Sequence, residues 1–324
     1  MNGGGRVDWS FRRLTLGALL LACACGPEQA AERSAPVADA APSDAGTTNP
    51  TVDDARVVDT QSGSSLDASD SAPSPVDASG PPLDAGLPDT GLSFDCAPPA
   101  ICDDFESAAT GGPPRPDTWA IVTPNCSGTG QVSIDAAQAR RGRQSLKVSG
   151  AGGYCNHVFV ATPIAALGRH VFGRFFVRFA GALADSHVTF LAMMDSADSK
   201  DLRMGGQNRV LMWNREQDDA TLPEMSPVGT STSVAPKPEQ WLCIELEIDG
   251  ENGTITTSVD GSNVLGMTVD GTPTPDIDRQ WLTRVGWRPV LTDLKLGWES
   301  YGAEGATLWF DDVAFATRRI GCDP

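Results

Sequence analysis

Histidine and tyrosine are scarce in this chain of 324 residues, which has three of the former and two of the latter. Both residue types transfer protons in enzymes, so their scarcity leaves few ways to build an acid–base pair. The patterns Gly-x-Ser-x-Gly and His-Glu-x-x-His are absent, as is a phosphate-binding loop. The sequence therefore lacks the common motifs of serine hydrolases, zinc peptidases and P-loop enzymes.

Basic residues are also few, with 24 Lys and Arg against 42 Asp and Glu and a net charge of −18. Nucleic-acid binding requires Lys and Arg against the phosphates, so no nucleic-acid partner is expected. No Cys-x-x-Cys spacing is present. Together with the few histidines, this absence argues against a zinc site.

No apolar run is long enough to span a membrane as a mature helix. At residues 1–22, Arg6, Arg12 and Arg13 precede a short apolar core at 14–22, which is typical of an export signal. Residues 20–23, Leu-Leu-Ala-Cys, resemble a bacterial lipobox. They predict a lipoprotein signal peptide and lipidation of Cys23.

Two alternatives to this anchor stay open: lipidation of Cys25, or an ordinary signal peptide without a lipid. Ala24 follows Cys23, in place of the Asp that is linked to retention in the inner membrane. We therefore expect a membrane-anchored lipoprotein, displayed on the outer membrane or the cell surface.

Residues 23–92 contain mainly Ala, Asp, Pro, Ser, Gly and Thr, with no aromatic residue and no apolar period. Such a composition cannot bury enough surface to fold, so this segment is predicted to be an acidic, disordered linker. The folded domain is expected at 93–324, as a monomer.

Six cysteines lie in the folded region, an even number that favours disulfides in an exported chain. Fifteen pairings are possible. The preferred pairing is Cys96–Cys102, Cys126–Cys155 and Cys243–Cys322.

Residues 93–324 contain many short alternating segments with turn residues between them and no long amphipathic helix. Strands are expected near residues 142–148, 171–179, 187–194, 209–215, 241–248, 254–259, 264–269, 284–288, 294–298 and 308–315. This pattern predicts an all-β, two-sheet antiparallel sandwich of the concanavalin-like, jelly-roll type.

The last expected strand places Trp309, Val313 and Phe315 on one face together with Asp311. A carboxylate there needs a partner, because burying an unpaired charge is costly. If the first and last strands are neighbours, Glu106 and Asp311 can converge on one calcium ion, a cation that prefers oxygen ligands. Solvated acids at strand ends are the alternative.

Three motifs resemble those of jelly-roll carbohydrate-binding modules: Asp104-Phe105-Glu106, Gly142-x-x-Ser145-Leu146 and the closing Trp309-Phe310-Asp311-Asp312-Val313. Those modules hold a structural calcium between the first and last strands. The resemblance thus implies Ca²⁺ at Glu106 and Asp311, with Asp104 and Asp312 as further candidates.

Three further motifs resemble the core domain of the fungal cellulose-induced secreted proteins (Cip-type): Trp241-x-Cys243-x-Glu245, Val259-Asp260-Gly261 and Ile320-Gly321-Cys322. That domain is related in shape to glucuronan and alginate lyases. The resemblance covers essentially all of 93–324 and implies a jelly roll with a polysaccharide partner. It does not establish an activity.

Polar residues in phase on the opposite strand faces form a second candidate surface. They are Arg178, His187, Gln207, Arg209, Trp213, Arg215, Lys295, Glu299 and Tyr301. Arg178, Gln207, Arg209 and Trp213 are the candidate carbohydrate-binding residues, since Arg and Gln can pair with a uronate carboxylate and Trp can stack on a sugar. For β-elimination, His187 and Tyr301 are the candidate base and acid. The alternative is an ordinary solvated strand face.

Glycoside hydrolysis is a less favoured reaction for this chain. It needs two carboxyl groups at the scissile bond, and the row Glu245, Glu247, Asp249 resembles the laminarinase pattern without matching it. Glu247 is a minor candidate, and a solvated outer face is preferred.

Three functions therefore stay open. The first is a surface-displayed module that binds polysaccharide, and the second is a lyase that cleaves uronate-containing glycans by β-elimination. The third is a non-catalytic scaffold of the cell envelope.

Overall fold

The structure is a computed structural model that describes residues 96–123 and 128–322. Cys23, Cys126 and the boundaries expected at residues 22 and 92 lie outside the described residues. Within them, no helix is long and apolar enough to cross a bilayer.

Sheet A is antiparallel and consists of β1 (Ile101–Asp103), β3 (Gln131–Asp135), β4 (Ser145–Gly150), β6 (His170–Phe179), β11 (Trp241–Asp249), β12 (Thr254–Val259), β13 (Ser262–Asn263) and β15 (Ala306–Ala316). The strand order is β13-β12-β11-β6-β15-β4-β3, and β1 pairs with the end of β15. The first and last strands are therefore neighbours, as the calcium hypothesis requires.

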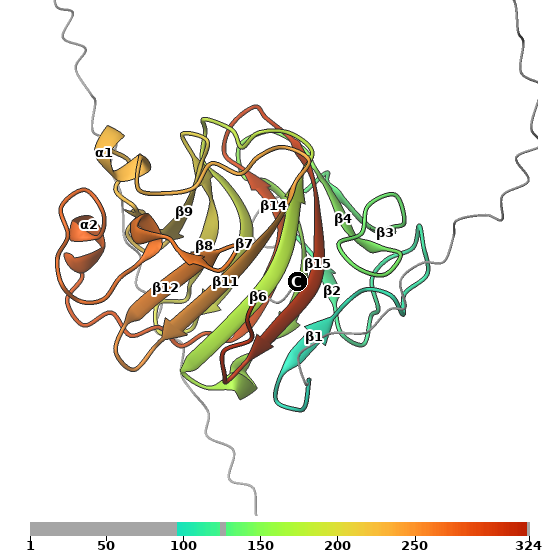
Figure 1. The fold of residues 1–324 in the computed structure, drawn as a ribbon, viewed down its shortest axis with the longest axis horizontal. Coiled ribbons are helices and arrows are strands. Elements are labelled where there is room, and N and C mark those ends of the chain that lie inside the picture. Colours follow the sequence, from blue (N-terminus) through green and yellow to red (C-terminus); the bar gives the residue numbers. More distant parts are fainter. Residues whose placement is uncertain (1–95, 124–127, 323–324) are drawn as a thin grey trace, which may run out of the picture. The chain divides into compact units, whose positions relative to one another are not determined.

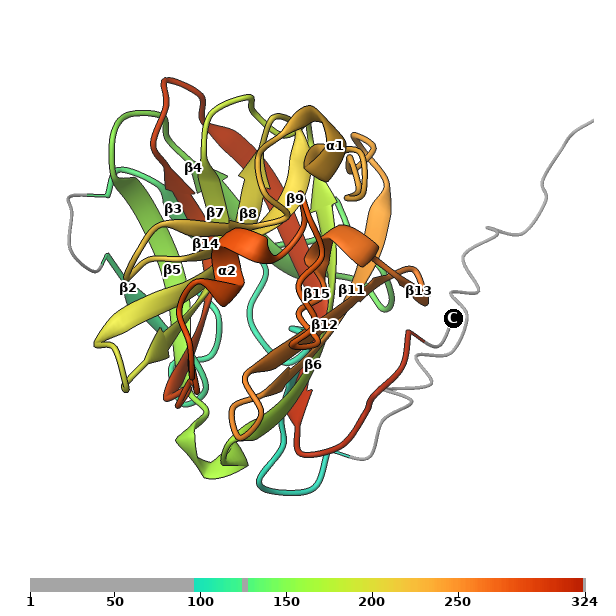
Figure 2. The same cartoon turned by 90° about the vertical axis from the view of Figure 1, so that its left-hand side faces the viewer.

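Sheet B is antiparallel and consists of β2 (Ala120–Val122), β5 (Asn156–Pro163), β7 (Val188–Asp195), β8 (Lys200–Gln207), β9 (Val210–Arg215), β10 (Ala220–Leu222) and β14 (Asp293–Ser300). Its strand order is β10-β9-β8-β7-β14-β5-β2. The helices are short: α1 (Pro227–Thr230), α2 (Arg279–Leu282), and the 3₁₀ turns η1 (Ala165–Leu167) and η2 (Leu265–Met267). Sheet A is the front layer in Figure 1, and Figure 2 shows the two layers side by side. The predicted all-β sandwich is confirmed.

The core lies between the two sheets and follows the period-two pattern of the strands. In β6, Phe175, Val177 and Phe179 point into the core, as predicted, while Arg174 and Arg178 belong to the opposite face. Burying such large apolar side chains is the main force that holds the two sheets together.

The predicted core face of the last strand is correct for Val313 and Phe315 and wrong for Trp309, because β15 contains a β-bulge between them. Its register with β6 runs from Asp311 opposite Phe176 to Ala314 opposite Arg174, so β15 has one extra residue there. The backbone of Asp312 has φ 46°. This insertion changes the phase, so Phe310 and Val313 both face the core while Trp309 lies on the outer face.

Seven strands were not expected from the sequence: β1, β2, β3, β5, β8, β10 and β13, of which β5 and β8 are the longest. Conversely, residues 264–269 form η2 and a single bridge from Val269 to Ile255, and residues 284–288 form a turn region after α2. The structure contains the preferred disulfides Cys96–Cys102 and Cys243–Cys322. Such bonds form in oxidising compartments, which agrees with export.

Candidate functional site

The outer face of sheet B, which is turned away from sheet A, has small side chains on its central strand. The register places Thr189 of β7 between Glu299 and Gly205. One row further, Ala192 of β7 lies between Lys295 and Arg203. Long side chains from β14 and β8 can therefore meet above β7.

Lys295 makes the first of these connections. Its Nζ donates hydrogen bonds to Asp201 Oδ1 on β8, at 3.0 Å, and to Asp293 Oδ1 on its own strand, at 2.8 Å. Burial raises the pKa of Asp201, and the nearby Lys295 ammonium opposes that rise. At this end of the outer face, the positive charge of Lys295 is therefore paired with the carboxyl groups of Asp201 and Asp293.

Arg203 makes the second connection, towards Tyr301, which directly follows β14. Its Nη1 donates to the Tyr301 hydroxyl at 2.8 Å, and its Nη2 lies 2.9 Å from Glu216 Oε1. The Tyr301 hydroxyl in turn donates to Glu299 Oε1 at 3.0 Å. Burial raises the pKa of Tyr301, and the Glu299 carboxylate adds to that rise, so the phenol stays protonated at neutral pH.

His187 stacks on Tyr301, with ring centroids 5.0 Å apart and planes at 23°. Burial lowers the pKa of His187 to about 4, and the positive charge of Arg203 contributes to this effect. The imidazole is therefore neutral at pH 7. The two residues proposed from the sequence as base and acid are in contact, and their environments shift the two pKa values in opposite directions.

Tyr154 extends this aromatic row towards solvent. Its ring meets that of Tyr301 edge-on at 5.5 Å, and 83% of the residue is exposed. A large exposed aromatic beside polar groups offers an apolar surface together with a hydrogen-bonding tip. We call the three rings of Tyr154, Tyr301 and His187 the aromatic row.

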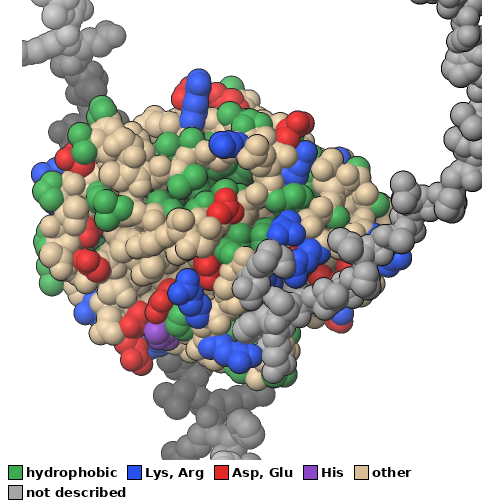
Figure 3. Space-filling model, viewed as in Figure 1, with side chains coloured by type: hydrophobic (Ala, Val, Ile, Leu, Met, Phe, Trp, Pro, Cys, Tyr) green, Lys and Arg blue, Asp and Glu red, His purple; other side chains and the backbone are tan. Residues whose placement is uncertain are grey.

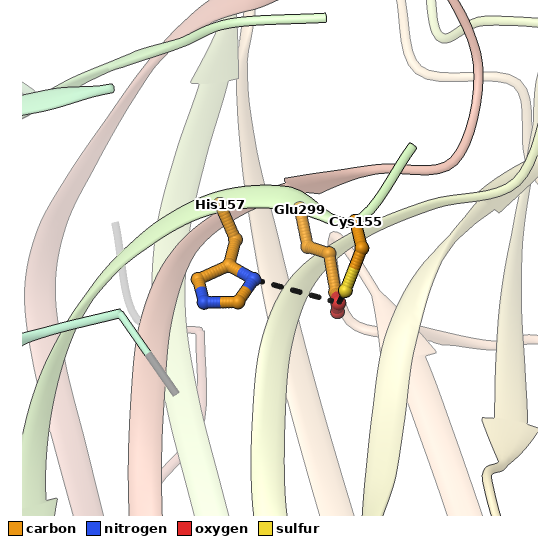
Figure 4. A group of neighbouring side chains, drawn as sticks. All are labelled: Cys155, His157 and Glu299. Atoms are coloured by element: carbon orange, nitrogen blue, oxygen red, sulfur yellow. Dashed lines mark hydrogen bonds and ion pairs between the residues drawn. The ribbon is translucent and has the colours of Figure 1, made fainter. Parts of the chain in front are cut away.

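Next to the row, Cys155, His157 and Glu299 bring three potential metal ligands within 4.8 Å of one another (Figure 4). Cys155 is disulfide-bonded, however, so it offers no thiolate. The remaining pair, His157 Nδ1 and Glu299 Oε1 at 3.7 Å, provides only two ligands. This group therefore does not fit a zinc site, which takes at least three protein ligands.

Of the four predicted carbohydrate-binding residues, Gln207 and Arg209 lie at the end of sheet B that carries the aromatic row. The register of β7 with β8, extended by one pair, sets Gln207 beside His187 on the same face. Arg209 lies in the turn after β8, where it pairs with exposed Asp185 at 2.9 Å.

The other two lie elsewhere. Arg178 belongs to sheet A, where its guanidinium lies over the Trp309 ring at 5.1 Å. Trp213 is fully buried between the sheets and donates from Nε1 to Thr257 at 2.8 Å. Trp213 cannot stack on a sugar, because the odd-numbered side chains of β9 face the core. Arg215, in the same phase, is buried against Trp281.

Two residues of the candidate site, Arg203 and Tyr154, were not predicted from the sequence. Arg203 alternates with Asp201, Gly205 and Gln207 along β8, so the period-two signal was present in the sequence. Tyr154 follows two glycines in a turn before β5, and no pattern of neighbouring residues distinguished it.

Glu106 and Asp311 bind opposite ends of one segment, residues 140–144. Asp311 Oδ2 accepts the backbone N–H of Arg140 at 2.6 Å, and Glu106 Oε1 accepts those of Arg143 and Gln144 at 2.7 and 2.8 Å. Burial raises the pKa of Asp311 to about 8, against the effect of the Arg140 hydrogen bond. The two predicted calcium ligands therefore meet the same loop, and their carboxylate oxygens are of the type that calcium prefers.

Comparison with known proteins agrees with this architecture. Residues 104–318 match the family model described as polysaccharide-lyase-like, Cip1-like core domain. Among solved structures, the cellulose-induced protein Cip1 is 40% identical over 69% of this chain and 100% of its own, with a TM-score of 0.63.

More distant structural matches include an endo-β-1,4-glucuronan lyase from the fungus Trichoderma reesei, at 14% identity and a TM-score of 0.41, covering 64% of this chain and 94% of the lyase. A sialidase matches at 12% identity and a TM-score of 0.44, covering 67% of this chain and 18% of its own. Among curated proteins there is no match. The family model spans most of the chain, and the chain belongs to the Cip1-like family of polysaccharide-lyase-like core domains.

Proposed function

We propose that the outer face of sheet B binds a uronate-containing polysaccharide. The observation that carries this proposal is the aromatic row with Arg203 at its side. An exposed Tyr154 ring can stack on a sugar, and the exposed guanidinium of Arg209, at the same end of sheet B, can pair with a uronate carboxylate. Membership of a polysaccharide-lyase-like family supports the same class of ligand.

The experiment compares retention of the wild type and two variants on glucuronan, alginate and pectin. Tyr154→Ala should weaken binding by about tenfold, or roughly 1.4 kcal/mol, without changing the melting temperature, because the side chain is mostly exposed. Val228→Ala, which truncates another exposed apolar residue, should bind like the wild type. Equal retention of Tyr154→Ala and the wild type would reject the site.

A second candidate, cleavage by β-elimination, is favoured by the contact between His187 and Tyr301. In this reaction the base removes the C5 proton of the uronate, a C4–C5 double bond forms, and the C4–O bond breaks as an acid protonates the leaving oxygen. A neutral imidazole can take the proton and a protonated phenol can supply one. Arg203 would stabilise the negative charge that develops on the carboxylate side.

The unsaturated product absorbs in the ultraviolet, so turnover is measured on the same polysaccharides. A lyase would be identified if the ultraviolet absorbance rises with the wild type but not with His187→Gln or Tyr301→Phe, while both variants are still retained on the polysaccharide. Retention by the wild type without any unsaturated product would leave binding as the function.

We also propose one structural calcium ion at Glu106 and Asp311, with Asp104 and Asp312 as further candidates. Support comes from the shared 140–144 loop and from the pairing of β1 with β15, which brings the acidic segment after β1 to the bulge of β15. When bound, calcium would fix this loop. It would supply no chemistry to the aromatic row, which lies on the other sheet.

A further inference from the structure

A groove of about 240 Å³ lies on the outer face of sheet A, where β11, β12 and the C-terminal tail meet. Figure 3 views the molecule from the sheet A side and shows acidic and basic side chains interspersed there. The tail runs beside β11 because Cys322 is bonded to Cys243 of that strand. The volume is slightly below the roughly 300–1,000 Å³ of pockets for drug-sized ligands, so it suits one or two sugar units.

The strand registers arrange the lining side chains in two rows. Ser258 lies between Asn263 and Glu245 in the first row. In the second row, Glu247 lies between Thr256 and Phe172. Directly opposed residues of antiparallel strands point to the same side, so hydroxyls, an amide, two carboxylates and one aromatic ring converge on the groove.

Both carboxylates already have basic partners. Glu245 Oε1 accepts the Gly321 N–H at 3.1 Å and lies 3.6 Å from Arg319 Nε, and Glu247 Oε1 lies 2.7 Å from His170 Nε2. The groove therefore offers acceptor oxygens for hydroxyl groups rather than an unpaired charge for an ion. This distinguishes it from the uronate site proposed on sheet B.

Phe172 supplies the apolar surface of the groove. The residue is partly exposed, and its ring stacks on His170 with centroids 4.6 Å apart. His170 is thus held between Phe172 and Glu247, which restricts the Phe172 ring before any ligand arrives. A restrained aromatic ring loses little entropy when it packs on the C–H face of a pyranose.

We propose that this groove is a second carbohydrate site, which takes neutral pyranose units. Carboxylate, hydroxyl and amide groups bind the sugar hydroxyls, and Phe172 packs on the ring. The groove and the aromatic row lie on the outer faces of opposite sheets, so one domain can hold two polysaccharide chains at once. The inference rests on the groove alone and does not depend on the uronate site.

The test measures the affinity of the full chain for cellohexaose, xylohexaose and mannohexaose by calorimetry. At least one should bind, and Phe172→Ala should weaken that binding about tenfold. Asn263→Ala, an exposed hairpin residue, is the second variant and should weaken it as well. Since the ligand is neutral, the affinity should be unchanged between about 0.1 and 1 M salt.

Tyr154→Ala is the contrasting variant, because it alters only the row on sheet B. It should leave neutral-sugar affinity unchanged while it weakens uronate binding, so the two sites can fail separately. The groove is rejected if none of the three hexaoses binds. It is also rejected if Tyr154→Ala removes their binding while Phe172→Ala and Asn263→Ala do not.

Discussion

His187 lies where burial and a neighbouring cation act on the same ring. Its pKa is about 4 in the folded protein and 6.5 in the unfolded chain. Between these values the unfolded state binds more protons than the folded state. The free energy of unfolding should therefore fall as the pH drops from 6.5 to 4, by a total on the order of 3 kcal/mol.

Urea unfolding across this pH range measures the effect. In His187→Gln that part of the pH dependence should disappear, whereas His170→Gln, at a more exposed histidine, should retain it. The same pH profile in the wild type and His187→Gln would contradict the buried, neutral imidazole.

Single residues also show the limit of periodicity. It placed Arg209, Trp213 and Arg215 on one face of a strand, and that grouping holds for Trp213 and Arg215. It could not tell which face of β9 is the core, because both faces of the strand carry apolar residues and residues 211–215 are all buried, with Arg215 held against two tryptophans. Only the packing of Trp213 against Thr257 of the opposite sheet decides the face.

At the scale of elements, β8 depends on a glycine. A Cβ on Gly205 would lie 1.7 Å from the Val188 carbonyl oxygen of β7, a backbone atom that cannot move away without separating the strands. Gly205→Ala should therefore reduce the free energy of unfolding by about 3 kcal/mol.

The matched control is Gly181→Ala, where a Cβ would meet nothing within 4 Å. Urea midpoints of the two variants give the comparison. If both variants match the wild type, β7 and β8 are not as closely paired as described.

The same glycine explains why β8 was missed while β6 was predicted. Residues 171–179 alternate large apolar and polar side chains, so the strand is evident from its pattern. Residues 200–207 include Lys, Asp and two glycines, which are depleted in strands. Because no strand was predicted at residues 200–207, nothing in the pattern placed Arg203 near Tyr301. Long-range pairing of β8 with β7 overrides the weak local preference.

The calcium proposal belongs to the contact between β15 and the 140–144 loop. A ligand that binds only the folded state stabilises it by about 2.7 kcal/mol at a hundredfold excess over Kd. Chelation should therefore lower the melting temperature of the wild type and leave the melting temperature of Asp311→Asn unchanged. Identical chelator responses would contradict the site.

At the scale of the whole molecule, the Cys243–Cys322 disulfide joins the C-terminus to sheet A across 79 residues. Closing a loop of that length restricts the unfolded chain and stabilises the fold by about 4 kcal/mol. The double variant Cys243→Ser, Cys322→Ser should lose roughly this amount in urea unfolding under oxidising conditions. The Cys96–Cys102 disulfide closes a loop of only six residues. If removing Cys243–Cys322 lowers the free energy of unfolding no more than removing Cys96–Cys102, the stabilisation expected from the longer loop is contradicted.

The outer face of sheet B is the proposed uronate-binding surface. The most direct measurement is an amide NMR titration of the domain with glucuronan, alginate and pectin oligosaccharides. With at least one of these ligands, the shifts should cluster at Tyr154, His187, Arg203 and Tyr301. Shifts confined to sheet A, or none with any of the three, would contradict this proposal.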